Sequence, residues 1–343
     1  MYTLGIETSC DETACAVLKN GDQILSSVIS SSLLRHKPFG GVVPEIASRH
    51  CLEAIDLVYQ KALKKARLGA NQIDLIAVTR GPGLIGSIFV GVSFAKALSF
   101  SLDIPMVGVN HIEAHLEANF ISRKKPSAFI GLIVSGGHTS LVKYQNNHYY
   151  LLGETVDDAI GEAYDKVAKV LGLGYPGGPI IDRLARNGNS KVLSFTKPKQ
   201  EGRFDFSFSG IKTAVLNLYE RDTKKFRSEQ FLGDFCASFQ ETVMQWVTQK
   251  TVLASEVEGI KNIVVGGGVS ANSRLRELLT EQANRNGLKL FLPSFELTTD
   301  NAAMIARLGY SLFRRGTRSG FDMIADPSLK IGGETNGNYT RRS

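Results

Sequence analysis

The sequence follows the same plan twice, and this repetition constrains the fold more strongly than any single motif. The first copy opens with TLGIETSCDETACAVLKNGDQILSSVIS, which predicts an apolar strand, a polar turn, a second strand, a tight turn at 20–22 and a third strand. The second copy opens at Phe129 with FIGLIVSGGHTSLVKYQNNHYYLLGETV, where strands and turns have the same order. Helical pattern follows each opening, so we expect two similar α/β halves.

The two halves also end alike. In the first, DLIAVTRGPGLIGS predicts a buried strand, a glycine-rich turn and the start of a helix, and IPMVGV is a strand that leads into NHIEAHL. In the second, KNIVVGGGVSANSRLRELL and LKLFLP repeat this order before the helix of LTTDNAAMIARLGYSLF. His111 and Asp300 are therefore predicted to occupy equivalent places, one in each half, where a helix opens after the last strand.

Two β-β-β-α-β-α-β-α halves are the plan of the actin, sugar-kinase and Hsp70 ATPase class, a duplicated, ribonuclease H-like, two-lobed α/β fold. In that class the strand-end turns of both lobes converge on a nucleotide cleft, in line with ligand binding beyond the carboxyl ends of strands. We expect an N-terminal lobe over 1–122 and a C-terminal lobe over 123–330. The largely helical stretch of about 157–257 predicts an insertion in the second lobe, and the polar tail 331–343 is predicted to be disordered.

Composition favours a cytoplasmic protein with an acidic partner. The net charge of +7 and the isoelectric point of about 9.1 suit a partner such as nucleic acid. The four cysteines form no CxxC pair, as is usual in a reduced compartment. No basic-then-apolar leader opens the sequence, and the most apolar stretch, 84–98, contains Lys96 and two glycines. That stretch is too short and interrupted to span a bilayer, so no membrane association is expected.

Three glycine-rich turns are candidate ligand-binding loops: VSGGHTS at 134–140, GYPGGP at 174–179 and VGGGVSAN at 265–272. Glycine lets a ligand approach the backbone closely, and the exposed N–H groups suit phosphate or carboxylate oxygens. The last turn also precedes a helix, whose positive end favours an anion. Each turn alone could be a plain reversal of the chain, but three in a duplicated frame favour a nucleotide site.

The segment NHIEAHL is a candidate metal site. Residues on a helix advance about 100° each, which leaves His111 and His115 roughly 40° apart and able to share one ion. In the zinc-protease pattern HExxH the glutamate directly follows the first histidine, whereas Glu113 lies about 200° round the helix and faces away. With Asp300 the two imidazoles would suit iron or zinc. The alternative is a structural histidine pair.

Several carboxylates and one further histidine accompany these turns. Asp165 and Asp182 flank the second glycine turn, where carboxylates accept from ribose or substrate hydroxyls, unless they are helix-surface acids. His138 could contact substrate or hydrogen-bond its own turn. The turn GIETSCDET, directly after the first strand, is expected to face phosphates with a polar set of Glu7, Thr8, Ser9, Asp11, Glu12 and Thr13.

Taken together, these motifs resemble a known family. The segments GIETSCDET, GGVVPEIASRH, GPGLIGS, NHIEAHL, VSGGHT, GEAYDKVAKVLGLGYPGGP, FSFSGIKT, GGGVSANSRLR and TDNAAMIA resemble the tRNA threonylcarbamoyladenosine transferases, the TsaD-like proteins once described as O-sialoglycoprotein endopeptidases. The resemblance runs in order from about residue 2 to residue 325.

The resemblance implies a function and a set of sites. The enzyme would transfer the threonylcarbamoyl group from threonylcarbamoyl-AMP to N6 of the adenosine 3′ of the anticodon, in tRNAs reading codons that start with A. One divalent metal, Fe²⁺ with Zn²⁺ as the alternative, would be held by His111, His115 and Asp300. The implied partners are tRNA, a TsaB-like paralogue and a TsaE-like ATPase, with the adenylate supplied by a TsaC-like synthase. The implied substrate-binding residues are Val134, Ser135, Gly136, Gly137, His138, Asp165, Gly178, Asp182 and Asn272.

The reaction and its rivals can be judged from the residues. No Ser or Cys triad is visible, so direct transfer is favoured over a covalent enzyme intermediate. The rivals are a metalloprotease, a small-molecule ATP-dependent kinase and a nucleotide-gated scaffold of the same fold class. A scaffold or kinase should tolerate loss of His111 and His115, whereas a metal-dependent transferase should not. The C-terminal segment 322–343, DMIADPSLKIGGETNGNYTRRS, departs from the basic and aromatic ending that is common in the family, which weakens any inferred tRNA contact there.

Overall fold

The computed structural model describes residues 1–196 and 202–333, and its contacts divide the chain into two units. The first unit combines Met1–Lys125 with the described part of Thr299–Ser343, and the second is Pro126–Thr298. This division differs from the expected boundary at 330, because residues from Thr299 onward pack in the first unit. Most of the tail predicted to be disordered, 334–343, lies outside the described residues.

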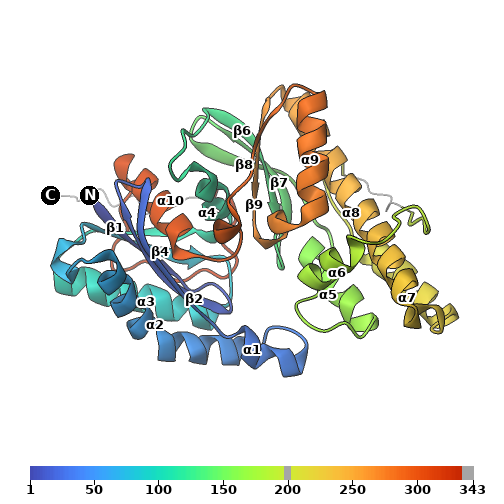
Figure 1. The fold of residues 1–343 in the computed structure, drawn as a ribbon. Coiled ribbons are helices and arrows are strands. Elements are labelled where there is room, and N and C mark those ends of the chain that lie inside the picture. The colour runs from blue at the N-terminus through green and yellow to red at the C-terminus, as the bar shows by residue number, and fades with distance from the viewer. Residues whose placement is uncertain (197–201, 334–343) are drawn as a thin grey trace. The chain divides into compact units, whose positions relative to one another are not determined.

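The first unit is built on a five-stranded mixed sheet (Figure 1). Its strand order is β3-β2-β1-β4-β5, antiparallel from β3 to β1 and parallel from β1 to β5. The strands are β1 Tyr2–Glu7, β2 Glu12–Lys19, β3 Gln23–Ser31, β4 Leu75–Gly81 and β5 Met106–Asn110. The helices are α1 Leu33–His36, α2 Pro44–Ala66, α3 Ile85–Leu102, α4 His111–Glu117 and α10 Ala302–Arg314.

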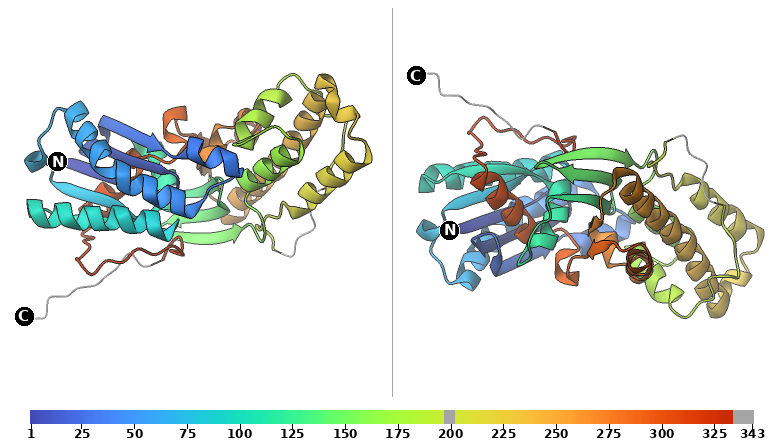
Figure 2. Two further views of the ribbon diagram at one scale, coloured as in Figure 1. Left: turned by 90° about the horizontal axis from the view of Figure 1, so that it is seen from below. Right: turned by 90° about the horizontal axis from the view of Figure 1, so that it is seen from above.

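Alternation along β1 explains how helices cover both faces of this sheet. Leu4 and Ile6 point to one face and belong to the same apolar cluster as residues of α2 and α3. Gly5 points to the other face, where an added Cβ would lie 2.1 Å from the backbone oxygen of Ala302 in α10. Figure 2 shows α2 and α3 on one side of the strands and α10 on the other. The absence of a side chain at Gly5 thus lets α10 approach, and α10 joins this unit.

Helix α3 is the one described helix that is long and apolar enough to cross a membrane by length and composition. It is longer than the apolar stretch expected from the sequence, and it packs against α2 and β4 within the first unit.

The second unit repeats the sheet of the first. Its strand order is β10-β9-β6-β7-β8, again antiparallel through the first three strands in sequence and parallel from β6 to β10. The strands are β6 Ala128–Val134, β7 Thr139–Gln145, β8 His148–Glu154, β9 Asn262–Gly266 and β10 Lys289–Phe291. The stretch between β8 and β9 is mostly helical, with α5 Ile160–Val170, α6 Gly177–Ala185, α7 Ser209–Arg221 and α8 Glu229–Glu258, and α9 Ser273–Arg285 follows β9.

Candidate functional site

Two of the three candidate metal ligands, His111 and His115, lie on α4, which begins where β5 ends. Asn110 caps this helix, since its side-chain oxygen accepts from the backbone N–H of Ile112 at 2.8 Å and of Glu113 at 3.2 Å. His111 is therefore the first residue of the helix, and His115 follows one turn later. Every residue of α4 is buried, so neither imidazole is free to turn into solvent.

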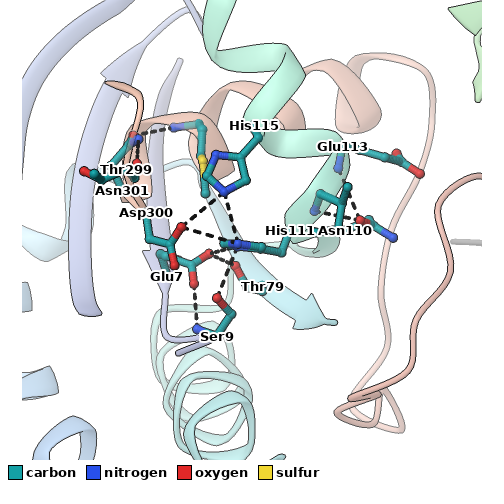
Figure 3. Close-up of polar contacts among 12 residues, drawn as sticks. Glu7, Ser9, Thr79, Asn110, His111, Glu113, His115, Thr299, Asp300 and Asn301 are labelled. Carbon is teal, nitrogen blue, oxygen red and sulfur yellow. Dashed lines mark hydrogen bonds and ion pairs between the residues drawn. The ribbon is translucent and has the colours of Figure 1, made fainter. Parts of the chain in front are cut away.

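Three donor atoms converge beside α4 (Figure 3). Nε2 of His111 lies 3.2 Å from Nε2 of His115, and Oδ1 of Asp300 lies 3.5 Å from the first and 3.1 Å from the second. Ligands held about 2.1 Å from one ion at tetrahedral or octahedral angles are separated by about 3.0–3.4 Å, so the spacing fits a shared ion. Three protein ligands leave further positions open, as in catalytic metal sites.

Asp300 reaches this group from the segment before α10. The next residue, Asn301, caps α10 by accepting from the backbone N–H of Met304 at 3.1 Å. Its side-chain amide also donates to the backbone oxygen of Thr299 at 2.8 Å, which fixes the loop on both sides of Asp300. The sequence prediction placed Asp300 in the second lobe. The structure corrects this, because α10 packs on the first sheet and carries Asp300 with it.

A buried carboxylate supports His111 from the sheet. Glu7, the last residue of β1, lies 3.0 Å from Nδ1 of His111 through its Oε2. The hydroxyl of Thr79 in β4 donates to the same oxygen, and the backbone N–H of Ser9 donates to Oε1 at 2.6 Å. Glu7 and Thr79 are fully buried. The turn after β1 was expected to face phosphates, but its first carboxylate faces the histidine.

Charge shapes the acid–base properties of this cluster. Burial lowers the pKa of His111, but the negative charges of Glu7 and Asp300 outweigh it and raise the pKa to about 9. Burial raises the pKa of Glu7, but the charge and hydrogen bond of His111 prevail and lower it overall. The charges of Glu7 and Asp300 thus favour the protonated form of His111.

Glu12, at the start of β2, is a second perturbed carboxyl in the first unit. Burial raises its pKa to about 9, and the neighbouring charge of Asp11 adds to the rise. The hydroxyl of Ser31 donates to its Oε1 at 3.1 Å. This shift favours the protonated form of Glu12, which can donate a hydrogen bond.

In the second unit, the predicted substrate residues 134–138 comprise the last residue of β6 and the closed turn that follows it. The backbone N–H of Ser135 donates to the carbonyl oxygen of His138 at 2.8 Å, and the N–H of His138 donates to the hydroxyl of Ser135 at 3.1 Å. A Cβ added to Gly136 or Gly137 would meet no atom within 4 Å, and neither residue has a positive φ. The fold itself therefore does not require glycine at these two positions.

The predicted residue Asp165 lies on α5, and its side chain contacts the start of α6, where Gly178 lies. Oδ1 of Asp165 accepts from the backbone N–H of Gly177 at 2.7 Å. Burial raises the pKa of Asp165, although hydrogen bonds from Gly177 and Gly178 oppose the rise. This carboxylate thus orders the glycine turn that the sequence singled out.

Asp182 and Asn272 are brought together by Gln240 of α8. The Gln240 amide donates to Oδ1 of Asp182 at 3.1 Å and accepts from the side chain of Asn272 at 2.8 Å. Oδ1 of Asp182 also accepts from the Ser273 hydroxyl at 2.7 Å, while the oxygen of Asn272 caps α9. All three residues are buried.

Sequence reasoning missed Gln240 and Thr79, and it assigned Glu7 to a different task. For Glu7 a signal was present, because a carboxylate ending a buried strand needs a partner. Gln240 and Thr79 lie in ordinary helix and strand pattern, which carries no such signal.

Comparison with known proteins agrees with the motifs. The family model for tRNA N6-adenosine threonylcarbamoyltransferase, TsaD, matches residues 23–307. The chain is 52% identical over 336 residues to the enzyme of that name from Clostridioides difficile, covering 96% of this chain and 98% of that protein. It is 48% identical over 334 residues to the Bacillus subtilis enzyme of the same name, covering 96% of each.

Solved structures show the fold. Full-length HypF in its phosphate- and nucleotide-bound form matches with a TM-score of 0.60 and 14% identity, over 92% of this chain and 47% of that one. Component A of the Acidaminococcus fermentans (R)-2-hydroxyglutaryl-CoA dehydratase matches with a TM-score of 0.51 and 16% identity, over 91% of this chain and 98% of that one. The fold is thus of the predicted actin, sugar-kinase and Hsp70 ATPase class.

Proposed function

The chain belongs to the tRNA N6-adenosine threonylcarbamoyltransferase family, and from this premise we propose how its two units divide the reaction. The protein is an acyltransferase that modifies tRNA. The proposed donor is threonylcarbamoyl-AMP, and the acceptor is N6 of the adenosine 3′ of the anticodon in tRNAs reading codons that start with A. The near full-length identity of about half to enzymes of this activity is the observation that carries the proposal.

The first unit contributes the metal centre. His111, His115 and Asp300 would hold one divalent ion, Fe²⁺ with Zn²⁺ as the alternative, since two imidazoles and a carboxylate suit either. When bound, such an ion polarises a carbonyl or stabilises a leaving phosphate.

Glu113 of α4 accepts a hydrogen bond from the backbone N–H of Gly332 at 2.9 Å. It is committed to a contact away from the ligand atoms, which argues against the metalloprotease alternative.

The second unit contributes the residues proposed to bind the adenylate. These are Val134, Ser135, Gly136, Gly137, His138, Asp165, Gly178, Asp182 and Asn272. The open space at Gly136, Gly137 and Gly178 supports this role, because a glycine that the fold does not need leaves room for a ligand against the backbone. Positioning by backbone contacts contributes much of the rate in such transfers. The transfer is proposed to be direct, without a covalent enzyme intermediate.

The proposed partners are a TsaB-like paralogue and a TsaE-like ATPase, with the adenylate supplied by a TsaC-like synthase. Helices α2 and α3 support a protein partner, since Leu52, Leu57 and Phe89 on them are all more than half exposed. The cytoplasm is the proposed compartment, because tRNA is the substrate. Co-purification of a Phe89→Asp variant with a TsaB-like protein would test this contact, and undiminished pairing would argue against it.

The test of function is a reconstituted modification. The protein and its partners are incubated with threonine, bicarbonate, ATP and unmodified tRNA, and the digested tRNA is examined for threonylcarbamoyl-adenosine by mass spectrometry. We expect product with the wild type and none with His115→Ala. If the partner proteins are active in separate assays and the folded wild-type protein still forms no product with them, the proposal is refuted.

A further inference from the structure

Glu7 is held as a carboxylate with both oxygens occupied. The hydroxyl of Thr79 donates to Oε2, and the backbone N–H of Ser9 donates to Oε1 at 2.6 Å. The remaining contact of Oε2 is with Nδ1 of His111 at 3.0 Å. Since Glu7 is fully buried, water does not compete for these bonds. The carboxylate is thus fixed in place before any ligand arrives.

This arrangement selects one tautomer of a neutral His111. A carboxylate only accepts hydrogen bonds, so the proton of the ring must lie on Nδ1. Oγ of Ser9, 3.2 Å from the same nitrogen, adds a second polar neighbour on that side of the ring. The lone pair then lies on Nε2, the atom that faces His115 and Asp300.

His115 lacks such support. Its Nδ1 is buried and has no hydrogen-bond partner among the described residues. The polar contacts of this second ring are at Nε2, with Asp300 and His111, so the two histidines differ in how their Nδ1 sides are fixed. This difference in hydrogen bonding at Nδ1 points to Glu7, which lies on β1, whereas both histidines lie on α4.

We propose that Glu7 is a positioning residue that holds His111 with its proton on Nδ1 and its Nε2 directed at the metal. This inference rests on the proposed metal site. A hydrogen-bonded partner of this kind orients a ligating imidazole and makes it more basic. In this role Glu7 acts only through the histidine.

The test is a metal titration of the full chain with Co²⁺ and Zn²⁺, read by cobalt absorption and by chelator competition. Glu7→Gln keeps the size of the side chain but offers an amide, which can donate to Nδ1 and favour the wrong tautomer. We expect its dissociation constants to rise about 10- to 100-fold. The matched control is Glu113→Gln, a buried glutamate of α4 that contacts Gly332, and we expect it to bind metal like the wild type.

A second readout follows the ring itself. In the Zn²⁺-loaded wild type, nitrogen-15 NMR should show His111 protonated at Nδ1, and that proton should move upfield in Glu7→Gln as its hydrogen bond weakens. Should Glu7→Gln fail to fold, Thr79→Val removes one donor from the carboxylate with little change of shape, and we expect an affinity loss of about 2- to 10-fold.

The outcomes separate the two proposals. Wild-type affinity and an unchanged ring signal in a folded Glu7→Gln variant would overturn the role of Glu7 while leaving the metal site intact. Failure of the wild type to bind either ion would overturn the metal site and the role of Glu7 with it. Equal losses in Glu7→Gln and Glu113→Gln would show a general effect of buried charge and overturn the specific role.

Discussion

The two units share one sheet topology but place different chemistry at the carboxyl ends of their strands. In the first unit the central strand β1 ends at Glu7, and in the second the equivalent strand β6 ends at Val134. At this end of its sheet the first unit gathers the buried ionisable side chains of Glu7, His111 and His115. The second unit has glycine turns with open space around Gly136 and Gly137. One sheet topology thus carries a cluster of ionisable side chains in the first unit and an open glycine turn in the second.

The difference has a physical consequence. Buried charges need partners, so the first unit must satisfy each ionisable group internally or with an ion. A glycine turn makes no such demand, because its N–H groups can face water until a ligand replaces it. Substitutions in the first unit should therefore disturb metal binding or stability, whereas those in the turn of the second should disturb ligand binding alone.

The largest expected effect is loss of the metal from the first unit. His115→Ala removes one of three donor atoms, and we expect affinity for Co²⁺ or Zn²⁺ to fall more than about 100-fold, with loss of modification activity. Equilibrium dialysis with elemental analysis measures the bound ion. His148→Ala, an exposed histidine in the second unit, is the control and should bind as the wild type does. If His115→Ala retained one tightly bound ion, the assignment of the metal site to these residues of the first unit would be wrong.

A glycine-to-alanine substitution should affect ligand binding in the second unit but stability in the first. At Gly137 an added methyl meets no protein atom, so Gly137→Ala should leave the melting temperature unchanged and raise the KM for threonylcarbamoyl-AMP about tenfold or more. At Gly5 the methyl would collide with the backbone of Ala302, so Gly5→Ala should destabilise the first unit by about 1–3 kcal/mol or more. Thermal melts and steady-state kinetics distinguish the two. A destabilised Gly137→Ala with a normal KM would contradict the assignment.

Much of this contrast could be predicted from sequence, because it depends on local pattern. Strand periodicity predicts both sheets, and the glycine runs predict the turns that follow them. The four-residue spacing of His111 and His115 predicts their shared face on α4. Each of these features depends on a pattern that extends over about ten consecutive residues.

Long-range pairings could not be predicted. Glu7 and His111 are 104 residues apart, and no local pattern says which helix a strand-end carboxylate will meet. The apolar face of α10 predicts burial but not which sheet buries it, so Asp300 was assigned to the wrong unit. One contributing feature is Gly5, where the missing side chain lets α10 approach the first sheet.

Metal binding to the first unit should depend on pH. Because the pKa of His111 is raised to about 9, its ring is protonated below that pH and must lose a proton to bind an ion. We expect the apparent affinity to fall about tenfold for each unit of pH between 8 and 6, with one proton released per ion. Calorimetry of Zn²⁺ binding in buffers of different ionisation enthalpy counts that proton. A pH-independent affinity without proton release would contradict the charge arrangement described for this unit.

The smallest expected effect concerns Glu113, another buried charge of α4. Burial raises its pKa from 4.5 to about 7, although the amide of Gly332 opposes the rise. Between those two pH values the native state binds a proton that the unfolded chain does not, so wild-type stability falls as pH rises through this range. The loss is at most about 3 kcal/mol above pH 7, and Glu113→Gln should remove it. The stabilising effect of the substitution should thus be small at pH 4.5 and largest at pH 8, as measured by urea unfolding without metal.

The control is Glu296→Gln, at an exposed site in the second unit, which should leave the pH dependence of stability unchanged. An equal gain in the free energy of unfolding from Glu113→Gln at both pH values would mean that packing of this side chain, rather than its charge, determines its effect on stability.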